Sequence, residues 1–181
     1  MRTQWILIAA LVTSVTCVQA QDTPKRKPGL WEIVSSSDRN GSQPRTLKMC
    51  TDEKTADLFS QLGDRAGQKV CSKRAVQHQG TQIVTDTVCT IAQSQVTSHA
   101  VMTFENPTSF TIEVHSSYNP ALFGRTESTS TQTGKWVGAC PSDMKAGDVL
   151  MPNGMKINLN AMLESKAGAP GEAPAAGPNT R

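Results

Sequence analysis

The chain has 181 residues, of which 37% are hydrophobic and only 4% aromatic, and 18 basic against 15 acidic residues leave a formal net charge of +3. So small and mixed a charge argues against the dense basic surface of a nucleic-acid-binding protein. The length allows one domain with a modest core, in which disulfides would matter.

The first twenty residues have the pattern of a secretion signal. Arg2 supplies a positive charge, the apolar run from Trp5 to Val15 is too short to span a bilayer, and Ala20 ends a small-residue cleavage site. Lipidation of Cys17 is the alternative, but the residues before it lack those that lipoprotein signals favour. We expect cleavage near Ala20, a flexible leader over residues 21–27, and a periplasmic or secreted protein without a membrane span.

The body of the domain, residues 28–141, is predicted to open with a hairpin. Segments 30–34 and 46–49 have the character of strands, and the turn-rich residues 37–42 separate them. The loop of this hairpin is therefore expected to be long.

A single helix is expected after this hairpin. The Thr51 hydroxyl can cap free backbone amides, and the Asp52 carboxylate favours the positive end of a helix dipole. Leu58 and Leu62 recur at helical spacing, and Gly63 can end the helix.

The stretch from 71 to 91 predicts a second hairpin that turns around Gly80, with residues 79–81 in the loop. Paired positions then sum to 160, which places three pairs opposite one another: Arg74 and Asp86, Val76 and Val84, and Cys71 and Cys89. Cross-strand Cβ atoms at about 4.5–5.5 Å lie close to disulfide reach. This register favours a Cys71–Cys89 disulfide and leaves Cys50 for Cys140, although four cysteines allow three pairings.

A third hairpin is predicted around a loop at 106–108, with paired positions summing to 214. Its apolar positions are all even-numbered: Val96, Ala100, Met102 and Phe104 on the first strand, and Phe110, Ile112, Val114 and Tyr118 on the second. Directly opposed residues share a face, so this register gives one apolar face that belongs to the core and one polar face that is exposed to solvent.

The polar face of this hairpin provides a candidate metal site. His99 and His115 face each other in the predicted register, and Glu113 lies on the same face. Two imidazoles and a carboxylate suit zinc or copper. Solvent-facing histidines on a polar sheet face are the more ordinary explanation, because no local ligand motif accompanies them.

Residues 126–133 are rich in Thr and Ser, so they have strand propensity but no apolar face. Such a strand belongs at a sheet edge or lines a polar surface. Residues 134–140 then close the body, and Trp136 is expected to cap the core together with Trp31.

Four methionines near the C-terminus are a second candidate metal site, as thioether ligands for Cu(I): Met144, Met151, Met155 and Met162. Their spacing is wider than in copper-binding runs, so packing of residues 142–167 against the body is favoured, with a short helix at 157–166. Residues 168–181, rich in Gly, Ala and Pro, are expected to be disordered.

Three motifs give the chain a resemblance to a known family. They are the opening Lys27-Pro28-Gly29-Leu30-Trp31-Glu32, the hairpin enclosed by Cys71 and Cys89, and the closing Gly134-x-Trp136-x-Gly138-x-Cys140. Over residues 28–141 the chain resembles a widespread domain-of-unknown-function family of exported Gram-negative bacterial proteins. The resemblance implies a fold and export, and it implies no catalytic residue.

The expected fold is mainly β: a curved antiparallel meander or open barrel of about seven strands, with one inserted helix and two disulfides. Such a sheet can close over a cavity lined by the even-numbered residues of 96–104 and 110–118. The expected function is therefore non-catalytic binding of a small apolar ligand or an envelope protein, without a cofactor.

Two alternatives are an interaction protein without a pocket and a metal-handling protein using His99 and His115. An enzyme is not expected, because the chain has no nucleophile elbow, no His-Glu-x-x-His and no phosphate loop.

Overall fold

The computed structural model describes residues 25–38, 43–55 and 58–164. The expected secretion signal, Cys17, most of the leader and the tail at 168–181 lie outside these residues.

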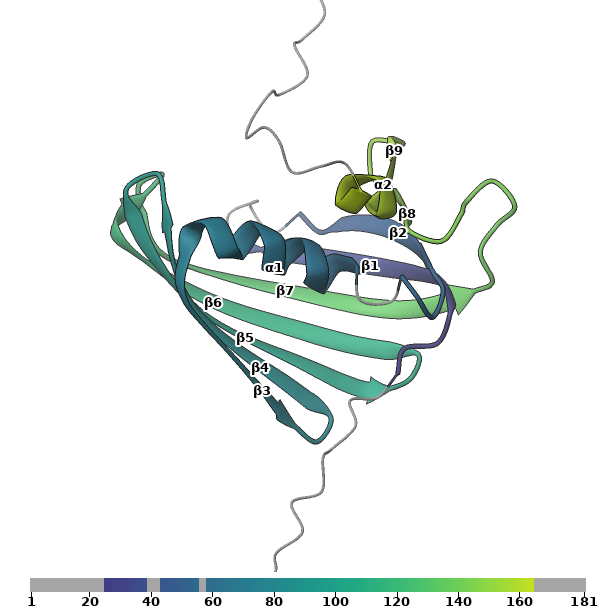
Figure 1. Ribbon diagram of the computed structural model, residues 1–181, viewed down its shortest axis with the longest axis horizontal. Helices are drawn as coiled ribbons and strands as arrows, with labels where there is room; N and C mark the ends of the chain where they lie inside the picture. The colour runs from purple at the N-terminus through teal and green to yellow at the C-terminus, as the bar shows by residue number, and fades with distance from the viewer. Residues whose placement is uncertain (1–24, 39–42, 56–57, 165–181) are drawn as a thin grey trace, which may run out of the picture.

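The described residues form one antiparallel sheet of nine strands with two helices (Figure 1). In chain order the elements are β1 (Gly29–Ser37), β2 (Arg45–Thr51), α1 (Leu58–Val70), β3 (Cys71–Gln79), β4 (Gln82–Ile91), β5 (Ser94–Asn106), β6 (Ser109–Leu122), β7 (Arg125–Gly138), β8 (Asp148–Leu150), β9 (Lys156–Asn158) and α2 (Leu159–Glu164). The order of strands across the sheet is β3-β4-β5-β6-β7-β1-β2-β8-β9.

The sheet is open and strongly curved, and α1 lies over its concave face (Figure 1). The predicted class is confirmed: the fold is mainly β, one helix follows the second strand, and the sheet is open. The two additional strands, β8 and β9, are only three residues each and follow the last cysteine. Sequence patterns of that length carry no readable alternation.

Both predicted disulfides are confirmed. Cys50 at the end of β2 is bonded to Cys140 beyond β7, across a sequence separation of 90 residues. Cys71 and Cys89 are bonded across the β3–β4 hairpin. One disulfide therefore closes most of the domain, and the other reinforces two neighbouring strands.

The prediction for the helix start was wrong, although the helix itself is present. The Asp52 carboxylate accepts hydrogen bonds from the backbone N–H groups of Lys54 and Thr55, at 3.0 and 2.8 Å, and so closes a turn. The helix begins at Leu58 and runs through Gly63 to Val70. A single glycine costs only about 1 kcal/mol inside a helix, and packing of one helical face overrides that cost.

The predicted register of the β3–β4 hairpin was wrong by one residue along most of its length. Gln79 pairs with Gln82, so the loop holds only two residues and begins with Gly80 at a φ of 62°. Glycine at the first loop position favours such a tight turn. A bulge near Ser72 then restores the predicted pairing of Cys71 with Cys89.

The register of the β5–β6 hairpin is as predicted. Phe104 pairs with Phe110 and His99 with His115, so the even-numbered apolar residues of both strands share one face. That face is the concave one, because Phe104 and Phe110 pack in the same core cluster as Leu58 of α1.

Of the two positions predicted for residues 126–133, the sheet edge was wrong, whereas Thr129, Ser130 and Thr131 do line a surface of polar residues. They lie within β7, which pairs with β6 on one side and with β1 on the other and so occupies the middle of the sheet. The hydroxyl side chains do not mark an edge. They put small residues on both faces of a central strand.

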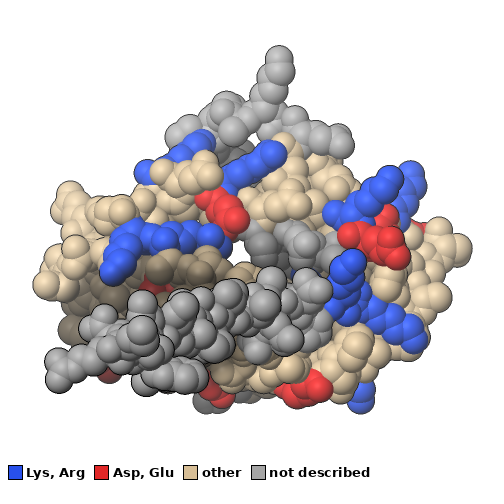
Figure 2. All heavy atoms as spheres, turned by 60° about the horizontal axis from the view of Figure 1, so that its bottom comes forward, with Lys and Arg blue, Asp and Glu red and all other residues tan. Residues whose placement is uncertain are grey.

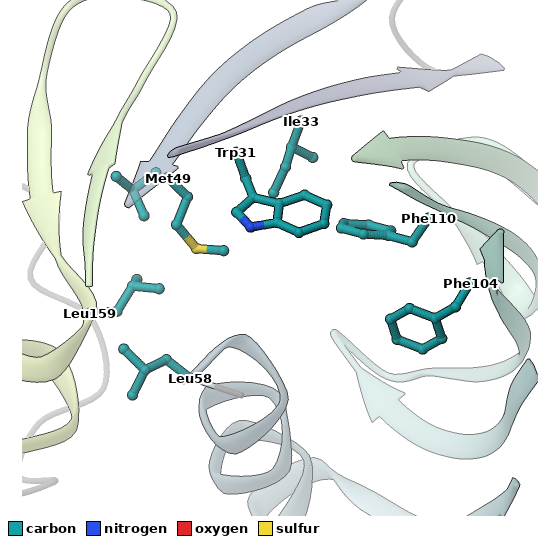
Figure 3. Close-up of a cluster of buried hydrophobic side chains, with 8 residues drawn as sticks. Trp31, Ile33, Met49, Leu58, Phe104, Phe110 and Leu159 are labelled. Atoms are coloured by element: carbon teal, nitrogen blue, oxygen red, sulfur yellow. The ribbon is translucent and has the colours of Figure 1, made fainter. Parts of the chain in front are cut away.

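The main core lies between the concave face and the two helices (Figure 3). The Trp31 ring lies 5.5 Å from the Phe110 ring, centroid to centroid, and the Phe104 and Phe110 rings lie 6.4 Å apart. Leu58 of α1 and Leu159 of α2 complete the cluster. Trp31 pairs with Trp136 of β7, which is half-buried against the same cluster.

A clasp of β8, β9 and α2 closes the β2 end of the sheet. Asp148 accepts hydrogen bonds from the Lys145 backbone N–H at 2.8 Å and from the Asn158 side-chain amide at 2.7 Å. The Lys145 N–H first, and then the Asn158 amide, hold the pKa of Asp148 below its usual value of 3.8. The clasp therefore depends on an ionised carboxylate.

Stability should depend on this carboxylate in acid. Because the folded pKa of Asp148 is lowered, its contribution is present above about pH 3.8 and is lost as the pH falls through the folded value. Urea unfolding should find Asp148→Asn less stable than the parent at pH 7, with the difference shrinking below pH 3.8. A difference that is constant with pH would contradict this role.

Candidate functional site: the concave floor

The middle of the concave face is a candidate ligand-binding surface. We define the concave floor as six residues on β4, β5 and β6: Ile83, Thr85, Ala100, Met102, Ile112 and Val114. Register joins them in two rows across the sheet, Ile83–Met102–Ile112 and Thr85–Ala100–Val114. Five of the six side chains are apolar, and the floor carries no titratable group.

The concave floor is only partly accessible to solvent, because Ile83, Met102 and Ile112 also pack against the core cluster. All six residues are half-buried, whereas the neighbouring pair Phe104 and Phe110 is only 5% and 3% exposed. At the other end of the same strands, Val96 and Tyr118 are again buried. The even-numbered residues predicted to line a cavity thus divide into two buried ends and a partly exposed middle, and they do not line either of the two pockets described below.

Small hydroxyl side chains border the floor toward Tyr118. Ser98 and Ser116 face each other across β5 and β6 and are hydrogen-bonded through their hydroxyls at 2.8 Å. The Tyr118 hydroxyl is hydrogen-bonded to the Ser128 hydroxyl of β7. These hydroxyl groups are hydrogen-bonded in pairs to one another.

Helix α1 is fixed over the floor from several sides. Leu58 and Leu62 pack into the core cluster. Arg74 of β3 forms an ion pair with Asp64 of α1 at 2.6 Å, and Arg65 donates a hydrogen bond to the Leu163 carbonyl of α2 at 2.6 Å. The helix is therefore anchored to the β3 edge and to the clasp, on either side of the floor.

A pocket of about 420 Å³ lies at the β2 end of the concave face. The described residues that line it are Ser35, Arg45, Leu47, Met151, Pro152 and Asn153. Ser35 and Arg45 lie on the row that carries Ile112, in the order Ile112–Gln132–Ser35–Arg45. The pocket therefore lies in line with the concave floor, with Gln132 of β7 between them.

A second pocket, of about 310 Å³, is lined among the described residues by polar residue types. Its described residues are Ser36, Ser37, Asp38, Thr129, Ser130 and Thr131. The Asp38 carboxylate is already engaged by Arg125 at 2.7 Å. Its described lining offers hydroxyl groups and no large apolar side chain.

The candidate metal site lies on the opposite, convex face. His99 and His115 pair across β5 and β6 as predicted, but His99 Nδ1 lies 2.7 Å from the Asp86 carboxylate. Glu113 is two residues from His115 and pairs with Val101. Among the described residues no three His, Cys, Asp or Glu side chains gather into a possible metal site.

The four C-terminal methionines have different surroundings. Met144 is 7% exposed and Met151 packs against the core, while Met155 and Met162 are both 52% exposed. Packing explains the first two. The last two have surfaces open to solvent.

The family-like motifs are architectural. The Trp31 and Trp136 indole N–H groups donate to the backbone carbonyls of Lys27 and Pro28, both at 2.9 Å, and the Lys27 ammonium lies 3.7 Å from the Trp136 ring centroid. A side chain on Gly29 would overlap the Gly138 carbonyl. The opening and closing motifs therefore hold each other together.

Sequence reasoning missed Arg45 and the β7 part of the concave face. The available signal was strand alternation, which places Arg45 on the same face of its strand as Leu47 and Met49. The place of β2 in the sheet could not be predicted from the sequence. Strands β7 and β1 lie between β6 and β2, and β7 and β1 pair across a sequence separation of about a hundred residues.

Charge is mixed over the surface. Figure 2 shows Lys and Arg side chains in several separate places, with Asp and Glu among them. Within the described residues, neither helix has the length and apolarity to cross a membrane.

A protein-family model described as "Protein of unknown function (DUF3617)" matches residues 26–140. The comparison with curated proteins and the comparison with solved structures gave no match. The matched range ends at the closing cysteine motif and excludes the β8–β9 clasp with its pocket residues.

Proposed function

The chain belongs to the DUF3617 family, and from this premise we propose that it is an exported, non-catalytic protein that holds a small apolar ligand on the concave floor. Two disulfides support the export, because such bonds persist in oxidising compartments. A secretion signal and the periplasm are part of this proposal.

The observation that carries the proposal is that the apolar residues of the concave floor remain partly exposed to solvent. Apolar side chains that stay partly exposed between a sheet and a helix cost free energy that burial by a ligand would recover, at about 25 cal/mol per Å². Apolar concave surfaces with polar borders are the usual form of small-molecule sites. The floor has this form, with hydroxyl groups along its border toward Tyr118.

The absence of titratable groups from the floor supports binding without catalysis. General acid–base and nucleophilic catalysis need such a group within hydrogen-bond reach of the ligand. Threonine is the sole polar residue type among the six floor residues.

The free edge of β3 supports a second candidate function, the binding of a protein partner by strand addition. Within the described sheet β3 pairs only with β4, so its outer edge is available. This candidate would need no ligand on the floor.

Replacing Ala100 with Trp should fill the floor and abolish ligand binding. The matched control is Val101→Trp, which adds a similar bulk at the next residue on the convex face, between Val84 and Glu113. The probe is the neutral fluorophore N-phenyl-1-naphthylamine, titrated into the folded protein. We expect the affinity to fall at least tenfold in Ala100→Trp and to stay within twofold in Val101→Trp.

Equal binding by both variants would place the site elsewhere, and no binding by the parent would refute the function. Circular dichroism of each variant establishes that the sheet is intact.

A further inference from the structure

The pocket at the β2 end adds one charge to an otherwise neutral surface. Arg45 is an exposed residue at the start of β2, and its guanidinium forms no hydrogen bond or ion pair with the described residues. The described lining of the pocket contains no carboxylate to neutralise it. A cation beside an apolar wall formed by Leu47 and Met151 is therefore available to an anionic ligand.

The pocket and the concave floor lie on one row of paired residues, which we call the path. The row Ile83–Met102–Ile112–Gln132–Ser35–Arg45 crosses six adjacent strands from β4 to β2. At about 4.8 Å between strands, the path measures roughly 24 Å along the sheet. It is apolar at the β4 end, polar and uncharged at Gln132 and Ser35, and cationic at Arg45.

Other nearby cations are already engaged. The Arg26 guanidinium lies 5.7 Å from the Phe110 ring centroid, and the Lys27 ammonium lies over the Trp136 ring. Lys48 follows Arg45 on β2, three residues on, and alternation places it on the convex face. Arg45 is the cation that the row presents to the concave side.

We infer that the ligand is a single-chain amphiphile with an anionic head, its acyl chain on the concave floor and its head at Arg45. This inference rests on the proposed function and adds the chemical class of the ligand. A guanidinium fork matches a carboxylate or a phosphate through two parallel hydrogen bonds, so both heads fit. A chain that crosses the floor places the head in the pocket.

Three twelve-carbon probes distinguish the contribution of the head group to affinity from that of the chain: dodecanoate, dodecyl phosphate and neutral dodecanol. Each displaces N-phenyl-1-naphthylamine from the parent, from Arg45→Gln and from Lys48→Gln, below micelle-forming concentrations. Lys48→Gln is the matched control, because it removes the same charge from the opposite face of the same strand.

We expect both anions to bind the parent more tightly than dodecanol, and Arg45→Gln to weaken them about tenfold while leaving dodecanol unchanged. Lys48→Gln should resemble the parent. The anion that binds more tightly identifies a fatty acid or a phospholipid-derived head as the source.

Equal affinity for the three probes, or an anion preference that survives Arg45→Gln, would overturn the assignment of the head to Arg45 and leave apolar binding in place. Displacement by none of the probes, with the fluorophore still bound, would overturn the acyl chain as well. A parent that binds neither fluorophore nor probes would refute the proposed function itself.

Discussion

Replacing both Cys50 and Cys140 with Ala is expected to lower the free energy of unfolding by about 4.5 kcal/mol. The bond closes a loop with a sequence separation of 90 residues, so its removal releases a large chain entropy to the unfolded state. Cys50 is also 1% exposed, and alanine at that position leaves a small gap in the core. Many domains of this size would have little stability left after such a loss.

Urea unfolding followed by tryptophan fluorescence measures this difference, with the Cys71→Ala/Cys89→Ala pair as the comparison. That disulfide closes a sequence separation of 18 residues, so its loss should cost about 3 kcal/mol. It also joins strands that backbone hydrogen bonds already hold together. A larger loss from the hairpin pair than from Cys50 and Cys140 would contradict the assigned roles.

The second large effect is expected from Gly134→Ala, at about 3 kcal/mol of lost stability. A Cβ at Gly134 would overlap the Phe110 ring, which packs across it from the neighbouring strand. Phe110 is 3% exposed and lies between Trp31 and Phe104, so its ring has no free direction in which to move. Overpacking a closed core forces side chains off their preferred rotamers.

Gly63→Ala is the matched control for this glycine. It lies inside α1, and a Cβ there would meet nothing within 4 Å. Alanine should stabilise the protein by about 0.5–1 kcal/mol, because it restricts the unfolded chain and favours the helix. Thermal or urea unfolding should therefore give opposite signs for the two substitutions; the same sign for both would show that the Phe110 ring is free to relax.

The sequence allowed accurate prediction where a local pattern determined the register. In β5 and β6, Phe104, Phe110 and their even-numbered neighbours specified one face, so a one-residue slip would have moved every apolar side chain into water. In β3 and β4 the two faces differ less, and the two-residue turn at Gly80 set the register instead. The predicted pairing of Cys71 with Cys89 was nevertheless correct, because a bulge between Cys71 and Lys73 compensates for the one-residue difference in register.

The concave floor could be predicted only in part. Its β5 and β6 residues follow from alternation, which is a property of each strand alone. Its extension to Arg45 depends on β7 lying between β6 and β1, a placement set by pairing between distant segments. The Ser and Thr residues of β7 have the pattern of an edge strand. Small hydroxyl side chains on both faces of a strand are compatible with an edge in solvent and equally with a central strand beside a pocket.

Native mass spectrometry of the protein isolated from the cells that make it tests the central claim most directly. We predict an adduct with the mass of one single-chain amphiphile, lost on unfolding, present in Val101→Trp and absent from Ala100→Trp. A parent carrying no adduct, or an adduct retained in full by Ala100→Trp, would contradict binding on the concave floor.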